Sequence, residues 1–139
     1  MQTASKKIVN GWAMYDWANS VYNLVITTTF FPAYYAAVTS LKNFPDGVTF
    51  LGRHFVNTEL KDYVLAFGFL VIALLSPILS SIADYKGNKK NFMRFFCYLG
   101  AVSCSLLFFF DKDHVWLGLI CLLFAGIGFY GSLVFYNSY

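Results

Sequence analysis

The chain has 139 residues, of which 58% are hydrophobic, 21% aromatic and only 12% charged, with a formal net charge of +3. Soluble domains carry about 25% charged residues, so this composition excludes an ordinary soluble domain. Basic residues do not alternate with aromatic residues as a nucleic-acid-binding surface requires. We therefore expect an integral membrane protein that has the lipid bilayer, and no nucleic acid, as its partner.

Four segments contain no Asp, Glu, Lys or Arg: residues 17–41, 63–83, 95–110 and 115–139. A helix needs about 20 apolar residues to cross the hydrocarbon core of a bilayer. The third segment is short, but it reaches this length when Arg94 extends its guanidinium group to the interface. The sequence therefore predicts an all-α membrane protein with four transmembrane helices, near 10–40, 58–83, 91–110 and 115–136.

The first predicted helix carries a polar stripe, in which residues recur at spacings of three and four: Asp16, Asn19, Ser20, Asn23 and Thr27. This spacing places them on one face of a helix. An aspartate facing central lipid costs roughly 2.5 to 3.5 kcal/mol, so we interpret the stripe as an interior path for a substrate or an ion. The alternatives are interhelical hydrogen bonding, worth about 0.6 kcal/mol per group, and, for Asp16, simple exposure to water near the inner interface.

The first loop is the only sizeable one, and Pro45-Asp46-Gly47 predicts a turn in it. The two histidines, His54 and His114, fall in predicted outer loops. They lack the spacing of metal ligands, and no nucleophile is placed beside a base. The sequence therefore predicts no metal site, no cofactor and no enzymatic activity.

A polar stretch separates the second and third predicted helices: Ser80-Ser81-Ile82-Ala83-Asp84-Tyr85-Lys86-Gly87-Asn88-Lys89-Lys90. Asp84 is expected at the C-terminus of a helix, where the dipole disfavours a negative charge, so it should seek a cation or the N-terminus of another helix. Gly87 permits a tight reversal, and Lys89 and Lys90 can reach Asp84 or lipid phosphates. The alternative is a solvated turn whose lysines only set the topology.

Basic residues concentrate before the first helix and between the second and third: Lys6, Lys7, Lys86, Lys89, Lys90 and Arg94. The other two loops mix basic and acidic residues. Because positive loops stay in the cytoplasm, we expect a cytoplasmic N-terminus in a multi-pass protein of a bacterial inner membrane. The fourth predicted helix runs to Tyr139 with no charged anchor after it, so we expect the chain to be a fragment.

The polar stretch resembles the signature loop of the major facilitator superfamily, in which a small residue, an aliphatic residue, Ala and Asp precede Gly and basic residues. The matching residues are Ser80, Ile82, Ala83, Asp84, Gly87, Lys89 and Lys90. Residues 12–20 (WAMYDWANS) and 128–137 (GFYGSLVFYN) resemble more specifically the branch related to vacuolar autophagy-associated amino-acid effluxers.

Members of this superfamily have about twelve helices in two halves of six. The resemblance therefore implies that residues 1–139 are the N-terminal part of the first half, with helices 1–4. It also implies an ionic latch at the inner gate, formed by Asp84, Gly87, Lys89 and Lys90. The chain departs from the usual pattern at Ser80, Tyr85 and Asn88, and its fourth helix has no arginine to pair with Asp84.

The function that follows from the resemblance is secondary active transport of a small solute by alternating access, with an amino acid as solute and protons as coupling ions. Two alternatives remain. One is a complete four-helix membrane scaffold or oligomeric subunit, with the glycines of the fourth helix as its contact face. The other is a small proton-coupled multidrug exporter that uses Asp16 as its coupling site.

Overall fold

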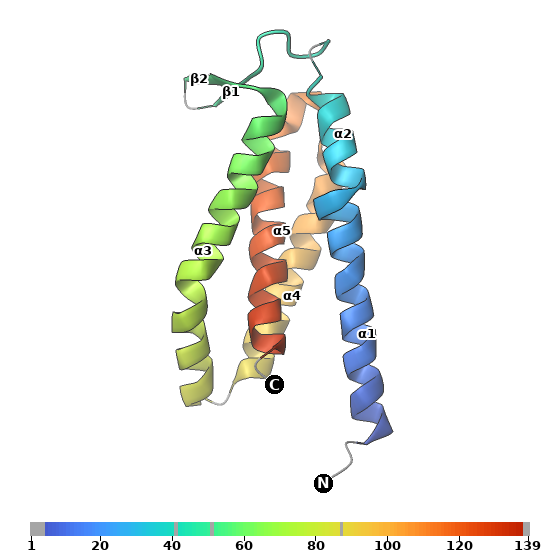
Figure 1. Ribbon diagram of the computed structural model, residues 1–139, viewed down its shortest axis with the longest axis vertical. Coiled ribbons are helices and arrows are strands. Elements are labelled where there is room, and N and C mark those ends of the chain that lie inside the picture. Colours follow the sequence, from blue (N-terminus) through green and yellow to red (C-terminus); the bar gives the residue numbers. More distant parts are fainter. Residues whose placement is uncertain (1–4, 41, 51, 87, 138–139) are drawn as a thin grey trace. The chain divides into compact units, whose positions relative to one another are not determined.

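The computed structural model describes residues 5–40, 42–50, 52–86 and 88–137 (Figure 1). The chain forms two compact units, Met1–Ala37 and Val38–Tyr139. The first unit is a helix in three parts, and the second contains a short hairpin followed by three long helices.

The helix of the first unit is interrupted near its middle. It consists of α1 (Lys6–Tyr22), the π-helix η1 (Asn23–Thr28) and α2 (Phe30–Val38). Thr29 leaves helical geometry, with φ −120° and ψ −74°. The helix predicted near 10–40 is therefore interrupted in the structure. Five consecutive β-branched residues, 25–29, disfavour the α-helix, and Pro32 has no N–H to bond the carbonyl of Thr28.

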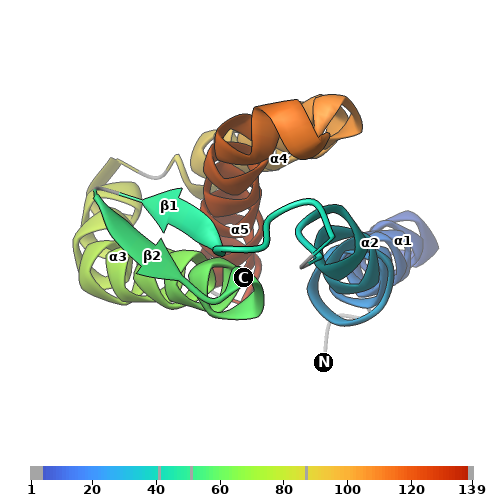
Figure 2. The same cartoon turned by 90° about the horizontal axis from the view of Figure 1, so that it is seen from above.

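Two short strands, β1 (Val48–Phe50) and β2 (Arg53–Phe55), form an antiparallel hairpin that the sequence analysis did not anticipate. Val48 pairs with Phe55, and the backbone reverses beyond Phe50 through Gly52, whose φ of 76° suits glycine. The hairpin lies at the end of α3 (Figures 1 and 2). Val48 of this hairpin is buried, with 4% of its surface exposed.

The long helices of the second unit are α3 (Asn57–Lys86), α4 (Lys89–Leu106) and α5 (Val115–Tyr136). The short 3-10 helices η2 (Leu107–Phe109) and η3 (Lys112–His114) connect α4 to α5. Three helical stretches of the described chain are long and apolar enough to cross a membrane: Thr58–Ile82, Lys89–Phe109 and Lys112–Tyr136. The protein is therefore an all-α membrane protein in its spanning part, and three of the four predicted spans meet this criterion.

Helix α5 is the centre of the second unit, because it packs against both α3 and α4 while those two contact each other little (Figure 2). Small residues bring α4 and α5 together. A Cβ atom added to Gly128 would lie 2.5 Å from the Gly100 nitrogen and 2.8 Å from the Phe96 carbonyl oxygen. Stacked rings of Phe96 and Phe135, 5.8 Å apart, continue the contact. Close approach through glycine is a common way to pack helices in lipid, where burial of apolar surface gives no driving force.

Candidate functional site

The predicted polar stripe lies on the interrupted helix of the first unit. Asp16, Asn19 and Ser20 are in α1, whereas Asn23 and Thr27 are in η1. The Asp16 side chain is exposed, and the Ser20 hydroxyl donates to the Asp16 backbone carbonyl at 3.1 Å. The α-helical spacing from Asp16 to Asn23 keeps these residues on one face, and the π-helix then changes the direction of the residues that follow.

The π-helix adds a residue that the predicted stripe did not include. Because π-helical bonds join residues five apart, Thr28 lies one turn beyond Asn23. Its hydroxyl is 3.0 Å from the Asn23 carbonyl oxygen and 3.2 Å from that of Leu24, to either of which it can donate. The hydroxyl oxygens of Thr28 and Thr29 are 3.3 Å apart. The polar face of the helix therefore continues to the break.

The break itself alters the backbone hydrogen bonds. The Thr29 N–H is shared between the Leu24 carbonyl, five residues back at 3.0 Å, and the Val25 carbonyl, four residues back. Since Pro32 cannot donate to the Thr28 carbonyl, that acceptor lacks its usual helical partner. In a bilayer, irregular backbone is tolerated where protein buries it or where it lines a water-filled cavity.

Asn19 has an unsatisfied side chain. Its amide nitrogen is shielded and has no hydrogen-bond partner within the residues that the structure describes. Shielded polar groups are normally paired, so an unpaired amide on the polar face marks a position where a ligand or a water molecule can bind.

The predicted inner-gate loop is shorter than expected. The sequence predicts a loop at 84–90, with Asp84 at the C-terminus of the second helix, whereas α3 continues to Lys86 and α4 begins at Lys89. Asp84 is thus in the last turn of α3, with a side chain outside the description, and Gly87 lies outside the described residues. Lys89 and Lys90 open α4. The polar residues at the end of α3 continue the helix to Lys86, because none of them is a residue that breaks a helix.

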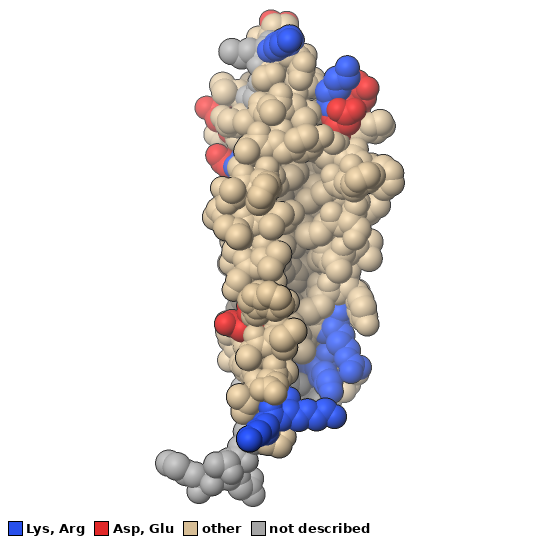
Figure 3. Space-filling model, turned by 90° about the vertical axis from the view of Figure 1, so that its right-hand side faces the viewer, with Lys and Arg blue, Asp and Glu red and all other residues tan. Residues whose placement is uncertain are grey.

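Charged side chains gather toward the ends of the helices on the face drawn in Figure 3, and the surface between them is almost free of charge. At the hairpin end, Lys61 and Asp62 form an ion pair, with Nζ 2.9 Å from Oδ1. Across the described ranges, no three His, Cys, Asp or Glu side chains are grouped as metal ligands.

Thr28 and Thr29 are the polar residues that sequence reasoning missed. The signal that could have found them is the β-branched run 25–29 followed by Pro32, since both features weaken an α-helix. The prediction of the polar stripe uses α-helical spacing alone, so it does not include Thr28 and Thr29.

A family model described as "Vacuole effluxer Atg22 like" matches residues 4–139. An uncharacterized MFS-type transporter, YxiO of Bacillus subtilis, is 39% identical over 132 residues, which cover 94% of this chain and 28% of the relative. Autophagy-related protein 22 of Pyricularia oryzae is 24% identical over 159 residues, covering 97% of this chain and 23% of the relative.

Autophagy-related protein 22 of Chaetomium globosum is similar at 25% identity over 156 residues, covering 97% of this chain and 24% of the relative. The chain therefore spans about a quarter of the length of the curated relatives that it matches. No solved structure matches the chain.

Proposed function

This chain belongs to the vacuole effluxer Atg22-like family, and on that premise we propose that it supplies the first four helices of a major-facilitator-type transporter that moves a small solute by alternating access. The observation that carries the proposal is the interrupted helix of the first unit, which combines a π-helix, a non-helical Thr29 and a polar face. Discontinuous helices with exposed backbone groups are typical of substrate and ion sites in transporters.

The proposal requires the first unit to cross the membrane as well, in addition to the three candidate spans of the second unit. Residues 6–38 would extend about 50 Å at about 1.5 Å per residue, which exceeds the roughly 30 Å of hydrocarbon. The interruption near its middle then falls at the depth where transporters bind their cargo. In this arrangement Asp16 and Asn19 face the interior path, as do Ser20, Asn23 and Thr27.

Charge supports an orientation with the N-terminus in the cytoplasm of a bacterial cell. Lys6 and Lys7 are the first two residues of α1, and Lys89, Lys90 and Arg94 lie in the first two turns of α4. We assign both groups to the cytoplasmic side by the positive-inside rule. Asp84, Gly87, Lys89 and Lys90 then form the inner gate, in which Asp84 pairs only while the cytoplasmic side is closed.

The solute we propose is an amino acid, coupled to protons through Asp16. The basis for the solute is the resemblance to vacuolar effluxers, and the basis for the coupling is that Asp16 is the acidic residue of α1. Carboxylates inside a membrane bundle are typical of proton relays.

The test is transport of radiolabelled amino acids into liposomes that contain the protein at its natural length. Asp16→Asn should lower proton-driven uptake on the order of tenfold or remove its pH dependence, because an amide cannot carry the proton. Asp46→Asn, in the exposed turn before the hairpin, is the matched control and should transport normally. Equal rates for the two variants would show that Asp16 is an interfacial carboxylate, and an absence of uptake by the wild type would reject the amino-acid assignment.

A further inference from the structure

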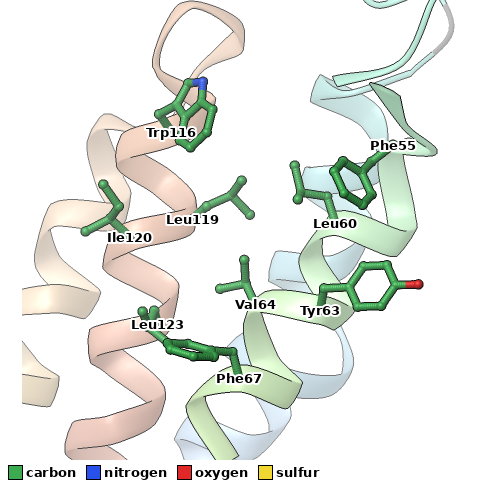
Figure 4. A pocket seen from close by; sticks show the side chains of 9 residues that line it. All are labelled: Phe55, Leu60, Tyr63, Val64, Phe67, Trp116, Leu119, Ile120 and Leu123. Atoms are coloured by element: carbon green, nitrogen blue, oxygen red, sulfur yellow. The ribbon is translucent and has the colours of Figure 1, made fainter. Parts of the chain in front are cut away.

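A groove of about 540 Å³ runs between α3 and α5 at the end of the second unit that bears the hairpin (Figure 4). Its walls come from the first turns of α3 and the first turns of α5, and Phe55 of β2 is also part of the lining. The Phe55 ring is held edge-on to Tyr63, with the ring centroids 5.9 Å apart. All nine lining side chains are apolar or aromatic, so the groove suits a hydrocarbon.

The length of the groove favours an acyl chain over a membrane-spanning helix as its occupant. On α3 the lining runs from Leu60 to Phe67 and on α5 from Trp116 to Leu123, which is about 10 Å at about 1.5 Å per residue. Deeper in the bundle, Gly68 lies against Leu123 and closes the gap between the helices. A single leaflet contributes about 15 Å, half of the roughly 30 Å hydrocarbon core. A spanning helix would need a groove along the full core, whereas an acyl chain enters from one leaflet.

The rims of the groove face outward. Tyr63 and Phe67 on α3 are 61% and 56% exposed, and Trp116 and Ile120 on α5 are 46% and 51% exposed. Tyr and Trp near the end of a span are typical of the headgroup level. Within the second unit, the groove therefore begins at the depth of the headgroups and is open along both rims.

Charges of both signs lie just above the groove. Lys61 pairs with Asp62 next to the lining residues of α3. Lys112 is exposed between Asp111 and Asp113, one turn before Trp116, and the Asp111 carboxylate accepts the Lys112 backbone N–H at 2.7 Å. A mixed surface suits a headgroup with both a phosphate and an ammonium group, whereas an anionic headgroup favours a purely basic cluster.

From the depth, lining and charge of this groove, we propose that it binds one acyl chain of a zwitterionic phospholipid from the leaflet next to the hairpin. Phe55, Tyr63 and Trp116 enclose the upper part of the chain, and the charges of Asp62, Lys112 and the carboxylates beside Lys112 meet the headgroup. The site is independent of the polar path on the first unit.

Two groove-filling variants test the site in the natural-length protein, purified in mild detergent and analysed by native mass spectrometry. Val64→Trp and Ile120→Trp fill the groove from opposite walls and should lose the retained phospholipid. Leu74→Trp is the matched control, because it adds the same side chain at an exposed position of α3 outside the groove, and it should retain the lipid. Equal retention in all three variants would overturn the proposal.

A cross-linking experiment identifies the occupant without filling the groove. The photoreactive residue p-benzoylphenylalanine replaces Phe67 in the detergent-purified protein, supplied beforehand with equal amounts of phosphatidylethanolamine and phosphatidylglycerol. An adduct with the mass of phosphatidylethanolamine is expected. An adduct with phosphatidylglycerol would overturn the zwitterionic headgroup, and an adduct with a peptide of the same protein or of a second copy would replace the lipid by a protein occupant.

Discussion

The Asn19 amide is a polar group without the hydrogen bond that its shielding calls for. Leaving such a donor unpaired costs about 1 to 3 kcal/mol, and a leucine at this position would avoid the cost. The neighbouring Ser20 has no such deficit, since its hydroxyl donates to the carbonyl of Asp16. These adjacent residues therefore differ in one respect that an experiment can use: the Ser20 hydroxyl is paired within the helix, and the Asn19 amide nitrogen is not.

Replacing Asn19 by leucine should raise the free energy of unfolding by roughly 1 kcal/mol while lowering transport, because the donor is lost to the solute or to its water. Thermal unfolding in detergent and liposome uptake measure the two effects. Ser20→Ala is the control and should change neither by much. A less stable Asn19→Leu variant with normal uptake would assign Asn19 to packing instead.

The packing of α4 against α5 in the second unit depends on how closely the two backbones approach each other. At Gly128 the obstacle to a side chain is backbone, the Gly100 nitrogen and the Phe96 carbonyl, which cannot rotate away as a side chain can. At Gly11 in α1, a Cβ atom would meet nothing within 4 Å. The same substitution should therefore have opposite effects at the two positions.

Gly128→Ala should lower the free energy of unfolding by about 1 to 3 kcal/mol, because α4 and α5 must separate. Gly11→Ala should be neutral or stabilise by up to about 1 kcal/mol, since alanine favours the helix. Unfolding of both variants in detergent, followed by circular dichroism, gives the comparison. Similar stabilities would mean that the α4 and α5 backbones are farther apart than the structure has them.

These elements also show where sequence reasoning succeeds and where it stops. The bounds of α5, 115–136, equal the predicted ones, because an uninterrupted apolar run follows the charged residues that connect it to α4. Pro32 predicts a kink in the first helix, but the π segment before Thr29 escaped prediction. Polar residues at spacings of three and four indicate an α-helix, and that pattern carries no information about a π segment. The hairpin escaped because its three-residue strands are too short for an alternating pattern to stand out.

The candidate site was predicted only in part for the same physical reason. Sequence placed Asp16, Asn19, Ser20 and Asn23 on one helical face, and the structure keeps them within α1 and the start of η1. The sequence could not indicate which of their atoms lack hydrogen-bond partners, since that depends on neighbours brought together by folding. Asp84 was expected at the C-terminus of a helix and lies in the last turn of α3. The loop after it was predicted to begin too early, because helix propensity alone does not mark where a polar helix end stops.

For the whole molecule, the orientation in the membrane follows from charge. We expect the start of α4 in the cytoplasm and the hairpin on the opposite side. Cysteine variants of the natural-length protein, with the native cysteines replaced by alanine, test this in intact cells. A membrane-impermeant thiol reagent should label Asp46→Cys and should not label Lys89→Cys until the cells are opened. The reverse pattern would invert the topology.

The short connection between α4 and α5 has a consequence for how the protein is made. Phe110, 2% exposed, packs against Gly118, so the link between the two helices is itself part of their contact. Contacts between residues close in sequence form faster than distant ones. During synthesis, α4 and α5 should therefore associate as a helical hairpin as soon as both have left the ribosome, and the other helices would then assemble on a pair that is already in place.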